Sequence, residues 1–206
     1  MGLVQQFRRP SGVMGRVAGA MMAVINTPLV TMVTTAVAAT DGERILDIGF
    51  GPGVSLVLLA RAAPAAMVAG IDPSPVMVAM ARRRTAGLAG QPDIRQGTAA
   101  SLPWPDGAFD AVCATNSVQL WQPLPASLSE VARVLRPGGR LVLGVHERAV
   151  LPEGGTAGRH FDDRLVPALQ SAGFAGVDAG YRPTRGGQAL VCQAHRSPDP
   201  AGGQAS

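Results

Sequence analysis

Lysine is absent from this 206-residue chain, and aromatic residues make up only 4% of it. All 18 basic residues are therefore arginine, and the hydrophobic core must be built mainly from Ala, Val and Leu. The formal net charge is only +4, and no basic stripe with interleaved aromatic residues is present, so nucleic-acid binding is not expected. The one dense run, Arg82–Arg84, falls at the end of an expected helix, where cations complement the helix dipole.

Cysteine is nearly absent as well. Cys113 and Cys192 both fall in apolar segments and show no Cys-x-x-Cys spacing, which excludes a disulfide framework and a zinc site built on them. We expect both to be buried thiols in a reducing compartment, and therefore a cytoplasmic protein. The length predicts one domain, or one domain with a small appendage.

A long uninterrupted hydrophobic run is also missing. Residues 17–40 are uncharged and largely apolar, but Asn26, Thr27 and Pro28 interrupt them. Thr27 suits an N-cap and Pro28 the first position of a helix, which predicts two helices, 13–25 and 28–39. A membrane span would need about 20 continuous apolar residues. We therefore expect residues 1–42 to form a helical cap, either a lid over a ligand or packing for the core. A signal peptide ending near Ala38 is the alternative.

From residue 44 onward, short apolar segments alternate with helical ones, which predicts an α/β fold with a mostly parallel sheet flanked by helices. Strands are expected near 44–48, 66–71, 93–96, 109–114, 140–146, 176–180 and 189–194, and helices near 54–63, 74–86, 124–135 and 162–173. Residues 43–196 would form the ligand-binding domain. Residues 197–206 are rich in Pro, Gly, Ser and Gln and predict a disordered tail.

The segment Arg44–Gly53 carries the most specific pattern. An apolar strand ends in glycines at 49, 51 and 53, and a helical run follows. Glycine allows a sharp turn and leaves no Cβ between backbone and ligand. Val54 stands where a dinucleotide fingerprint would have its third glycine. A second apolar strand ends in Asp72, whose carboxylate could accept hydrogen bonds from the two hydroxyls of a ribose.

Four ordered segments resemble class I S-adenosylmethionine (SAM)-dependent methyltransferases, and especially their quinone-biosynthesis branch. Ile45–Gly53 resembles the first motif of the family, and Gly70–Ser74 the second. Gln96–Asp110 is similar to the exit of the third strand, and Glu130–Arg140 to the helix and turn before the fifth. The resemblance implies a Rossmann-like sheet of seven strands with the last strand antiparallel, and SAM as cofactor with S-adenosylhomocysteine (SAH) as product.

The resemblance further implies cofactor-binding residues at strand ends and in the turns that follow: Asp47, Gly49, Gly51, Gly53, Asp72, Pro73, Thr98, Ala99 and Asn116. Asp47 would help to hold the methionine ammonium group, or alternatively would brace the glycine turn. Asp72 would bind the ribose. Many relatives have an acid where Thr98 stands, so a hydroxyl or the backbone would meet the adenine amine here. Asn116 would lie near the methyl group, and Trp121 would either line the substrate pocket or fasten the next helix to the sheet.

For catalysis, His146 and Glu147 stand at the carboxyl end of the expected fifth strand, and His146 is the candidate general base, because imidazole titrates in the physiological range. A substrate-binding or structural histidine is the alternative. His160, Asp162 and Asp163 could be read as metal ligands, but we expect Asp162 to cap a helix and no metal to be bound. A Gly-rich connection, residues 148–161, would close over the substrate.

These inferences predict a methyltransferase acting on a small molecule, at a hydroxyl oxygen of a sugar, polyol or other alcohol. The alternatives are carbon methylation of a quinone precursor, methylation of a lipid, and a SAM-binding regulator without activity. The expected partner is a small-molecule acceptor. A homodimer through the N-terminal helices is possible on the sequence, and neither nucleic acid nor membrane insertion is expected.

Overall fold

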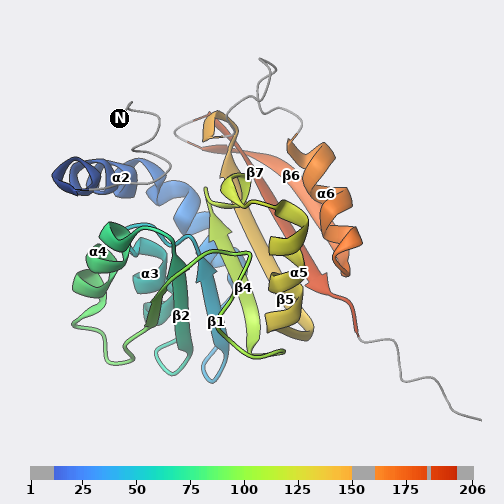
Figure 1. Cartoon of the computed structure of the whole chain (residues 1–206), viewed down its shortest axis with the longest axis horizontal. Coiled ribbons are helices and arrows are strands. Elements are labelled where there is room, and N and C mark those ends of the chain that lie inside the picture. The colour runs from blue at the N-terminus through green and yellow to red at the C-terminus, as the bar shows by residue number, and fades with distance from the viewer. Residues whose placement is uncertain (1–11, 150–160, 185–186, 199–206) are drawn as a thin grey trace, which may run out of the picture.

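The computed structural model describes residues 12–149, 161–184 and 187–198, in which helices and strands alternate along the chain (Figure 1). The helices are α2 (Gly12–Val37), α3 (Val54–Ala62), α4 (Pro75–Thr85), α5 (Leu124–Val134) and α6 (Phe161–Ser171), with the short 3-10 helices η1 (Val118–Leu120) and η2 (Glu147–Ala149). The strands are β1 (Arg44–Ile48), β2 (Met67–Asp72), β3 (Asp93–Gln96), β4 (Phe109–Thr115), β5 (Leu135–His146), β6 (Phe174–Thr184) and β7 (Gly187–Arg196).

The seven strands form one sheet in the order β3-β2-β1-β4-β5-β7-β6. β7 is antiparallel to both of its neighbours, and the pairs from β3 to β5 are parallel, so the predicted Rossmann-like α/β fold is confirmed. The chain runs outward from β1 to β3 and then returns to place β4 on the other side of β1. Open α/β sheets bind ligands where the order reverses in this way, outside the carboxyl ends of the strands.

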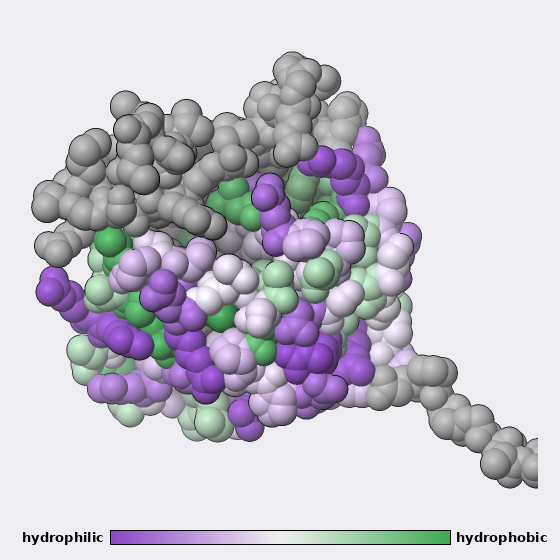
Figure 2. Space-filling view, in the orientation of Figure 1, coloured by the Kyte–Doolittle hydropathy of each residue, from purple (hydrophilic) through white to green (hydrophobic). Residues whose placement is uncertain are grey.

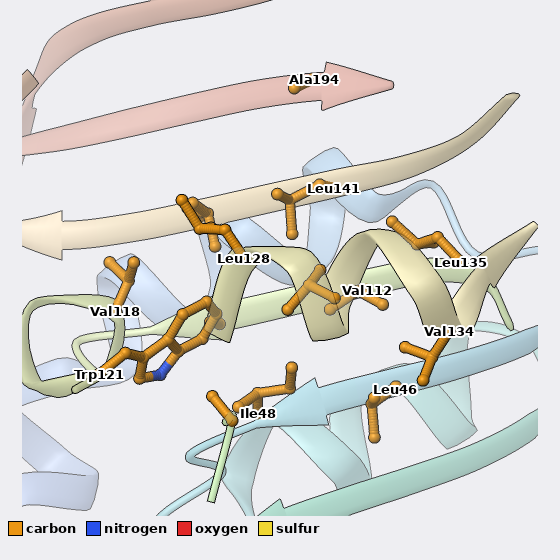
Figure 3. Close-up of a cluster of buried hydrophobic side chains, with 14 of the residues drawn as sticks. Leu46, Ile48, Val112, Val118, Trp121, Leu128, Val134, Leu135, Leu141 and Ala194 are labelled. Carbon is orange, nitrogen blue, oxygen red and sulfur yellow. The ribbon is translucent and has the colours of Figure 1, made fainter. Parts of the chain in front are cut away.

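One face of the sheet is covered by α5 and α6 (Figure 1). Leu128 and Val131 of α5 and Leu165 of α6 are fully or almost fully buried there. Figure 3 shows α5 lying along the strands, with Leu46 and Val112 in the cluster of side chains beside it. The three- and four-residue spacing of apolar positions in α5 places them on one stripe, and burial of each large aliphatic side chain stabilises the fold by about 1.5–3 kcal/mol.

The other face is covered by α3, α4 and the carboxyl-terminal part of α2. Leu29 and Val33 of α2 are fully buried. A Cβ at Gly144 of β5 would lie 2.4 Å from Cγ2 of Val33, so the absence of a side chain at residue 144 is what allows α2 to approach the sheet this closely. The N-terminal helix is thus partly built into the core.

α2 is one helix and not the predicted pair, so the expected break at residues 26–28 was wrong. Pro28 lies inside the helix, and the ribbon changes direction part-way along it (Figure 1). A proline inside a helix removes one backbone hydrogen bond and bends the helix, but packing can compensate for this cost. Here the buried residues that directly follow Pro28 supply that packing.

The carboxyl terminus of α2 is held by Arg140 of β5. Its guanidinium group donates to the carbonyl of Val37 at 2.6 Å and to both carboxylate oxygens of Glu43 at 2.6 and 2.7 Å. The last carbonyl groups of a helix have no partner within the helix, so an arginine there satisfies one of them. The pKa of Glu43 falls to about 2, mainly through its hydrogen bonds with Arg140. This link joins α2, the segment before β1, and the sheet.

β5 begins at Leu135, five residues before its predicted start. Leu135 pairs with Phe109, and a register shift between Phe109 and Ala111 accommodates residues 137–139, which the sequence predicts as a simple turn. β6 and β7 are likewise longer than predicted, because they form a hairpin that pairs as far as Thr184 and Gly187.

The described part of the face in Figure 2 mixes hydrophilic and hydrophobic residues rather than presenting one continuous hydrophobic patch. Cys113 and Cys192 are free, buried thiols, as predicted. Within the described ranges, no helix is long and apolar enough to cross a membrane. The predicted loop at 148–161 falls almost entirely outside those ranges, as does most of the predicted tail.

Candidate functional site

A cavity of about 520 Å³ opens at the carboxyl ends of β1, β2 and β4, where the strand order reverses. Eight of the predicted site residues line it, together with Trp121: Asp47, Gly49, Gly51, Asp72, Pro73, Thr98, Ala99 and Asn116. Residues separated by up to 74 positions in the chain therefore meet at one site. The position agrees with the ligand crevice expected for an open α/β sheet.

The three glycines of the turn have different roles. All have positive φ angles, of 76°, 54° and 81° for Gly49, Gly51 and Gly53, which residues with a side chain rarely adopt. A Cβ at Gly49 would lie 2.4 Å from Cβ of Ser117, and one at Gly53 would lie 2.9 Å from Cα of Ala81. At Gly51 no atom lies within 4 Å of that position. Gly49 and Gly53 thus allow close packing, and Gly51 leaves space open beside the cavity, which Gly53 does not line.

The Asp72 carboxylate lies at the end of β2 and joins two turns. It accepts hydrogen bonds from the backbone N–H groups of Gly51 and Ser74, each at 2.9 Å. Burial raises the pKa of Asp72, and these two hydrogen bonds oppose that shift. A carboxylate has about four acceptor positions, so each oxygen retains capacity for a donor in the cavity. Two adjacent hydroxyl groups are suitable donors.

Asp47, at the end of β1, is a second buried acid on the cavity wall. Its carboxylate accepts a hydrogen bond from the hydroxyl of Ser55, and it pairs across the sheet with Cys113. Burial raises the pKa of Asp47 to about 7, the Ser55 hydrogen bond opposes the shift, and the charge of Asp72 adds to it. Two buried acids beside one cavity favour a ligand that brings positive charge.

Thr98 and Ala99 lie on the opposite wall, in the turn after β3. The backbone N–H of Gly97 donates to the carbonyl of Asp72 at 3.2 Å, and a short bridge joins Thr98 to Ser101. The Thr98 side chain is exposed, whereas Ala99 is buried. The wall therefore offers backbone groups and one hydroxyl to a flat ligand such as a purine.

Asn116 connects β4 to β5 as well as lining the cavity. It has a positive φ of 51°, and its side-chain oxygen accepts a hydrogen bond from the backbone N–H of His146 at 2.8 Å. Its backbone N–H donates to the carbonyl of Gly144 at 2.7 Å. A left-handed asparagine of this kind persists only where surrounding contacts hold it. Asn116 thus holds the end of β4 beside β5.

Trp121 combines both alternatives predicted for it. The indole lines the cavity, and it also packs in the core with Val118, Leu128 and Ile48 (Figure 3). It therefore forms an apolar part of the cavity wall that is supported by packing against α5.

His146 and Glu147 do not line the cavity. His146 is the last residue of β5, with 1% of its surface exposed, and its Nδ1 lies 3.5 Å from the hydroxyl of Thr184. Glu147 begins η2. The general-base role of His146 stays a prediction based on its position in the sequence. His160, one of the considered metal ligands, lies outside the described residues, and Asp162 accepts a hydrogen bond from Tyr181 at 3.2 Å.

Ser55 and Asn26 also line the cavity, although the sequence did not predict them as site residues. Ser55 could have been found, because it lies in the first turn of the helix that leaves the glycine turn, and a hydroxyl there faces back toward the strand end. Asn26 and Val30 reach the cavity from α2. Their contribution depends on how α2 packs on the sheet, which no local pattern predicts.

The site fits SAM on three observations. The open space at Gly51 admits a ligand against the backbone, the Asp72 carboxylate can accept from ribose hydroxyls, and the buried acid Asp47 suits the positive charges of SAM. A family profile described as a methyltransferase domain matches residues 46–143, which include the glycine turn, Asp72 and the turn after β3. Residues 46–143 form a class I SAM-dependent methyltransferase domain. Its cofactor is SAM.

Relatives of this methyltransferase domain include a demethylmenaquinone methyltransferase of Thermus thermophilus, 39% identical over 129 residues, which cover 62% of this chain and 58% of the relative. A fatty-acid O-methyltransferase of Mycolicibacterium smegmatis is 42% identical over 108 residues, 52% of this chain and 38% of the relative. The chain thus covers less than two thirds of the length of each of these relatives. A SAM-dependent methyltransferase structure from Aquifex aeolicus superposes with a TM-score of 0.65, 19% identity and coverage of 81% and 89%, and shares the fold.

The raised pKa of Asp47 predicts pH-dependent binding. In the ligand-free protein this carboxyl is protonated below about pH 7, and a bound ammonium or sulfonium group favours its ionised form. Binding below pH 7 should therefore release a proton, and the affinity for SAH should rise by up to about tenfold per pH unit toward pH 7 and then level off. Calorimetric titration from pH 5 to 8 in buffers of different ionisation enthalpy would measure both effects.

Asp47→Asn provides the control, since it should flatten this pH profile.

The raised pKa of Asp47 also affects the stability of the protein. The folded state binds this proton more tightly than the unfolded chain, so the free energy of unfolding of ligand-free protein should fall as the pH rises from about 4 to about 7. A pH-independent SAH affinity in the wild type would contradict the role assigned to Asp47.

Proposed function

We propose that this protein transfers the methyl group of SAM to a small-molecule acceptor, at a hydroxyl oxygen, and that the acceptor carries an apolar part. The observation that supports this is the composition of the cavity wall beyond the residues assigned to the cofactor. Val30 of α2, Leu120 of η1 and Trp121 give it apolar surface, and Asn26 and Gln122 add polar groups. Binding sites commonly combine apolar walls with a few polar groups that orient the ligand.

SAM supplies a methyl group already activated on its sulfonium. The residues of this chain have the tasks of positioning and water exclusion, which are the main requirements for an in-line displacement. Asp72 would orient the ribose, and Asp47 would attract the ammonium end. Asn116 would fix the end of β4 next to the reacting groups. Val30 and Trp121 would keep water away from the acceptor.

Carbon methylation of a quinone precursor is the second candidate. It is favoured by the 39% identity to a demethylmenaquinone methyltransferase. The fatty-acid O-methyltransferase relative supports an oxygen acceptor on a hydrocarbon chain instead. Both relatives share an acceptor with apolar surface, which agrees with the walls formed by Val30, Leu120 and Trp121. They favour a quinol or a lipid over the sugar or polyol suggested by the sequence.

Product analysis separates these candidates. We would incubate the protein with SAM and a panel containing a naphthoquinol, a medium-chain fatty acid, an aliphatic alcohol and a monosaccharide. SAH formation would report turnover, and NMR of the product would distinguish O-methyl from C-methyl. We expect O-methylation of an acceptor with an apolar part, and loss of turnover in Asp72→Asn. Turnover of the monosaccharide alone, or tight SAH binding without turnover of any acceptor, would contradict the proposal, the latter in favour of a regulator.

His146→Asn belongs in the same assay. If His146 removes the acceptor proton, kcat should fall by about 100-fold or more while the affinity for SAH is unchanged. Unchanged kcat would assign His146 to structure, consistent with its burial at the end of β5.

A further inference from the structure

The turn of residues 97–101 forms the wall of the cavity opposite the glycine turn. Gly97, Thr98, Ala99 and Ala100 all line the cavity. At its beginning this turn is attached to β2, because the N–H of Gly97 donates to the carbonyl of Asp72. A Cβ at Gly97 would lie 2.7 Å from Cδ1 of Ile71, so the chain passes close to β2 there.

The far end of the same turn is held by α5. The carboxylate of Glu130 accepts a hydrogen bond from the backbone N–H of Leu102 at 2.8 Å. Arg133 donates to the carbonyl of Leu102 at 2.9 Å and to the carbonyl of Trp104 at 2.8 Å. The backbone that leaves the cavity wall is thus bound to two side chains on α5, neither of which lines the cavity.

The guanidinium group of Arg133 is itself oriented by Glu130. Its Nε and one terminal nitrogen donate to the two carboxylate oxygens at 2.7 and 2.9 Å. The other terminal nitrogen also donates to the carboxylate of Asp106 at 2.8 Å. Five hydrogen bonds therefore match the five N–H donors of the planar group. Lysine, with a single ammonium, could not reproduce this fork.

We propose that Glu130 and Arg133 are positioning residues that set adenine recognition, by holding the 97–101 turn in the shape that meets the base. This inference rests on the proposed cofactor-binding arrangement, in which Thr98 and Ala99 face the adenine. Thr98 itself is exposed, and an isolated bridge joins it to Ser101. Just beyond the turn, Arg95 also donates to the carbonyl of Pro103 at 2.7 Å. Anchors at Gly97 and Leu102 leave only the intervening residues free to adjust.

The test compares two ligands that differ only at the base. SAH carries the adenine amine, and S-inosylhomocysteine carries an oxo group in its place. We expect wild type to prefer SAH by roughly tenfold, the worth of one good hydrogen bond. Arg133→Lys should reduce that preference to roughly twofold or less, because the 97–101 turn would no longer hold its hydrogen-bond acceptors opposite the adenine amine. Glu130→Gln, which removes the carboxylate that orients Arg133, should lie between the two.

Arg136→Lys is the matched control. Arg136 also belongs to the Glu130–Arg140 segment and pairs with Asp110 at 2.5 Å, but it donates no hydrogen bond to the described 97–104 backbone. Its preference for SAH should equal that of wild type. A loss of folded protein lowers the active fraction and affects both ligands equally, so the ratio of the two affinities separates recognition from stability. Thermal unfolding and the stoichiometry of titration would record that fraction.

An unchanged ratio in both Arg133→Lys and Glu130→Gln would overturn the inference and leave these residues a purely structural role. Failure of wild type to bind SAH at all would instead contradict the proposed function. The two failures are therefore distinguishable within one set of titrations.

Discussion

Asp72→Asn should weaken SAH binding by about a hundredfold. The substitution replaces a carboxylate, which already accepts from the N–H groups of Gly51 and Ser74, by an amide with a single acceptor oxygen. Hydrogen bonds to a charged group contribute about 1.5–3 kcal/mol each, and a loss of about 3 kcal/mol corresponds to about a hundredfold in Kd. Isothermal titration with SAH would measure the change.

Asp41→Asn is the control for this experiment. Asp41 is exposed and also accepts a hydrogen bond from the backbone N–H of Ala65, at 2.8 Å. It precedes β1 and so lies at the amino end of that strand, away from the cavity at the carboxyl ends. Its substitution should leave SAH affinity unchanged. Thermal unfolding of both variants would show whether they remain folded. Wild-type affinity in a folded Asp72→Asn protein would remove Asp72 from the cofactor site.

Gly53→Ala should cost the protein much of its stability. The residue has a φ of 81°, and a Cβ there would lie 2.8 Å from Cβ and 2.9 Å from Cα of Ala81 in α4. Left-handed backbone strain costs about 1–3 kcal/mol. Overpacking against a helix backbone adds about 1–3 kcal/mol, because the helix must move. We therefore expect the free energy of unfolding to fall by roughly 2–6 kcal/mol in urea titrations.

Gly51→Ala is the matched comparison. It imposes similar backbone strain at a φ of 54°, but its Cβ meets no atom within 4 Å. Its free energy of unfolding should fall by only about 1–3 kcal/mol, since overpacking is absent, while SAH affinity falls because the new methyl group projects beside the cavity. Equal destabilisation by the two substitutions would contradict the separate packing and binding roles assigned to these glycines.

The sequence alone determined the class of fold, and its resemblance to class I SAM-dependent methyltransferases implied the cofactor. An apolar strand, a glycine turn and a helix are adjacent in the chain, so local geometry largely decides their form. Asp72 follows the next strand, and parallel neighbouring strands bring their carboxyl ends to one edge. The cavity accordingly contains eight of the predicted residues, although the sequence could not separate the packing of Gly53 from the open space at Gly51.

Tertiary structure decided what the sequence left open around the acceptor. Whether α2 breaks at Pro28 depended on packing against Gly144, more than a hundred residues away, and that packing also brings Asn26 and Val30 to the cavity. His146 ends β5, as predicted, but it is buried beside Thr184 and does not line the cavity. Such contacts join distant segments and depend on how side chains fit together. Local propensity and spacing carry no information about that fit. They predict only features whose residues lie within a few positions of one another, such as the glycine turn.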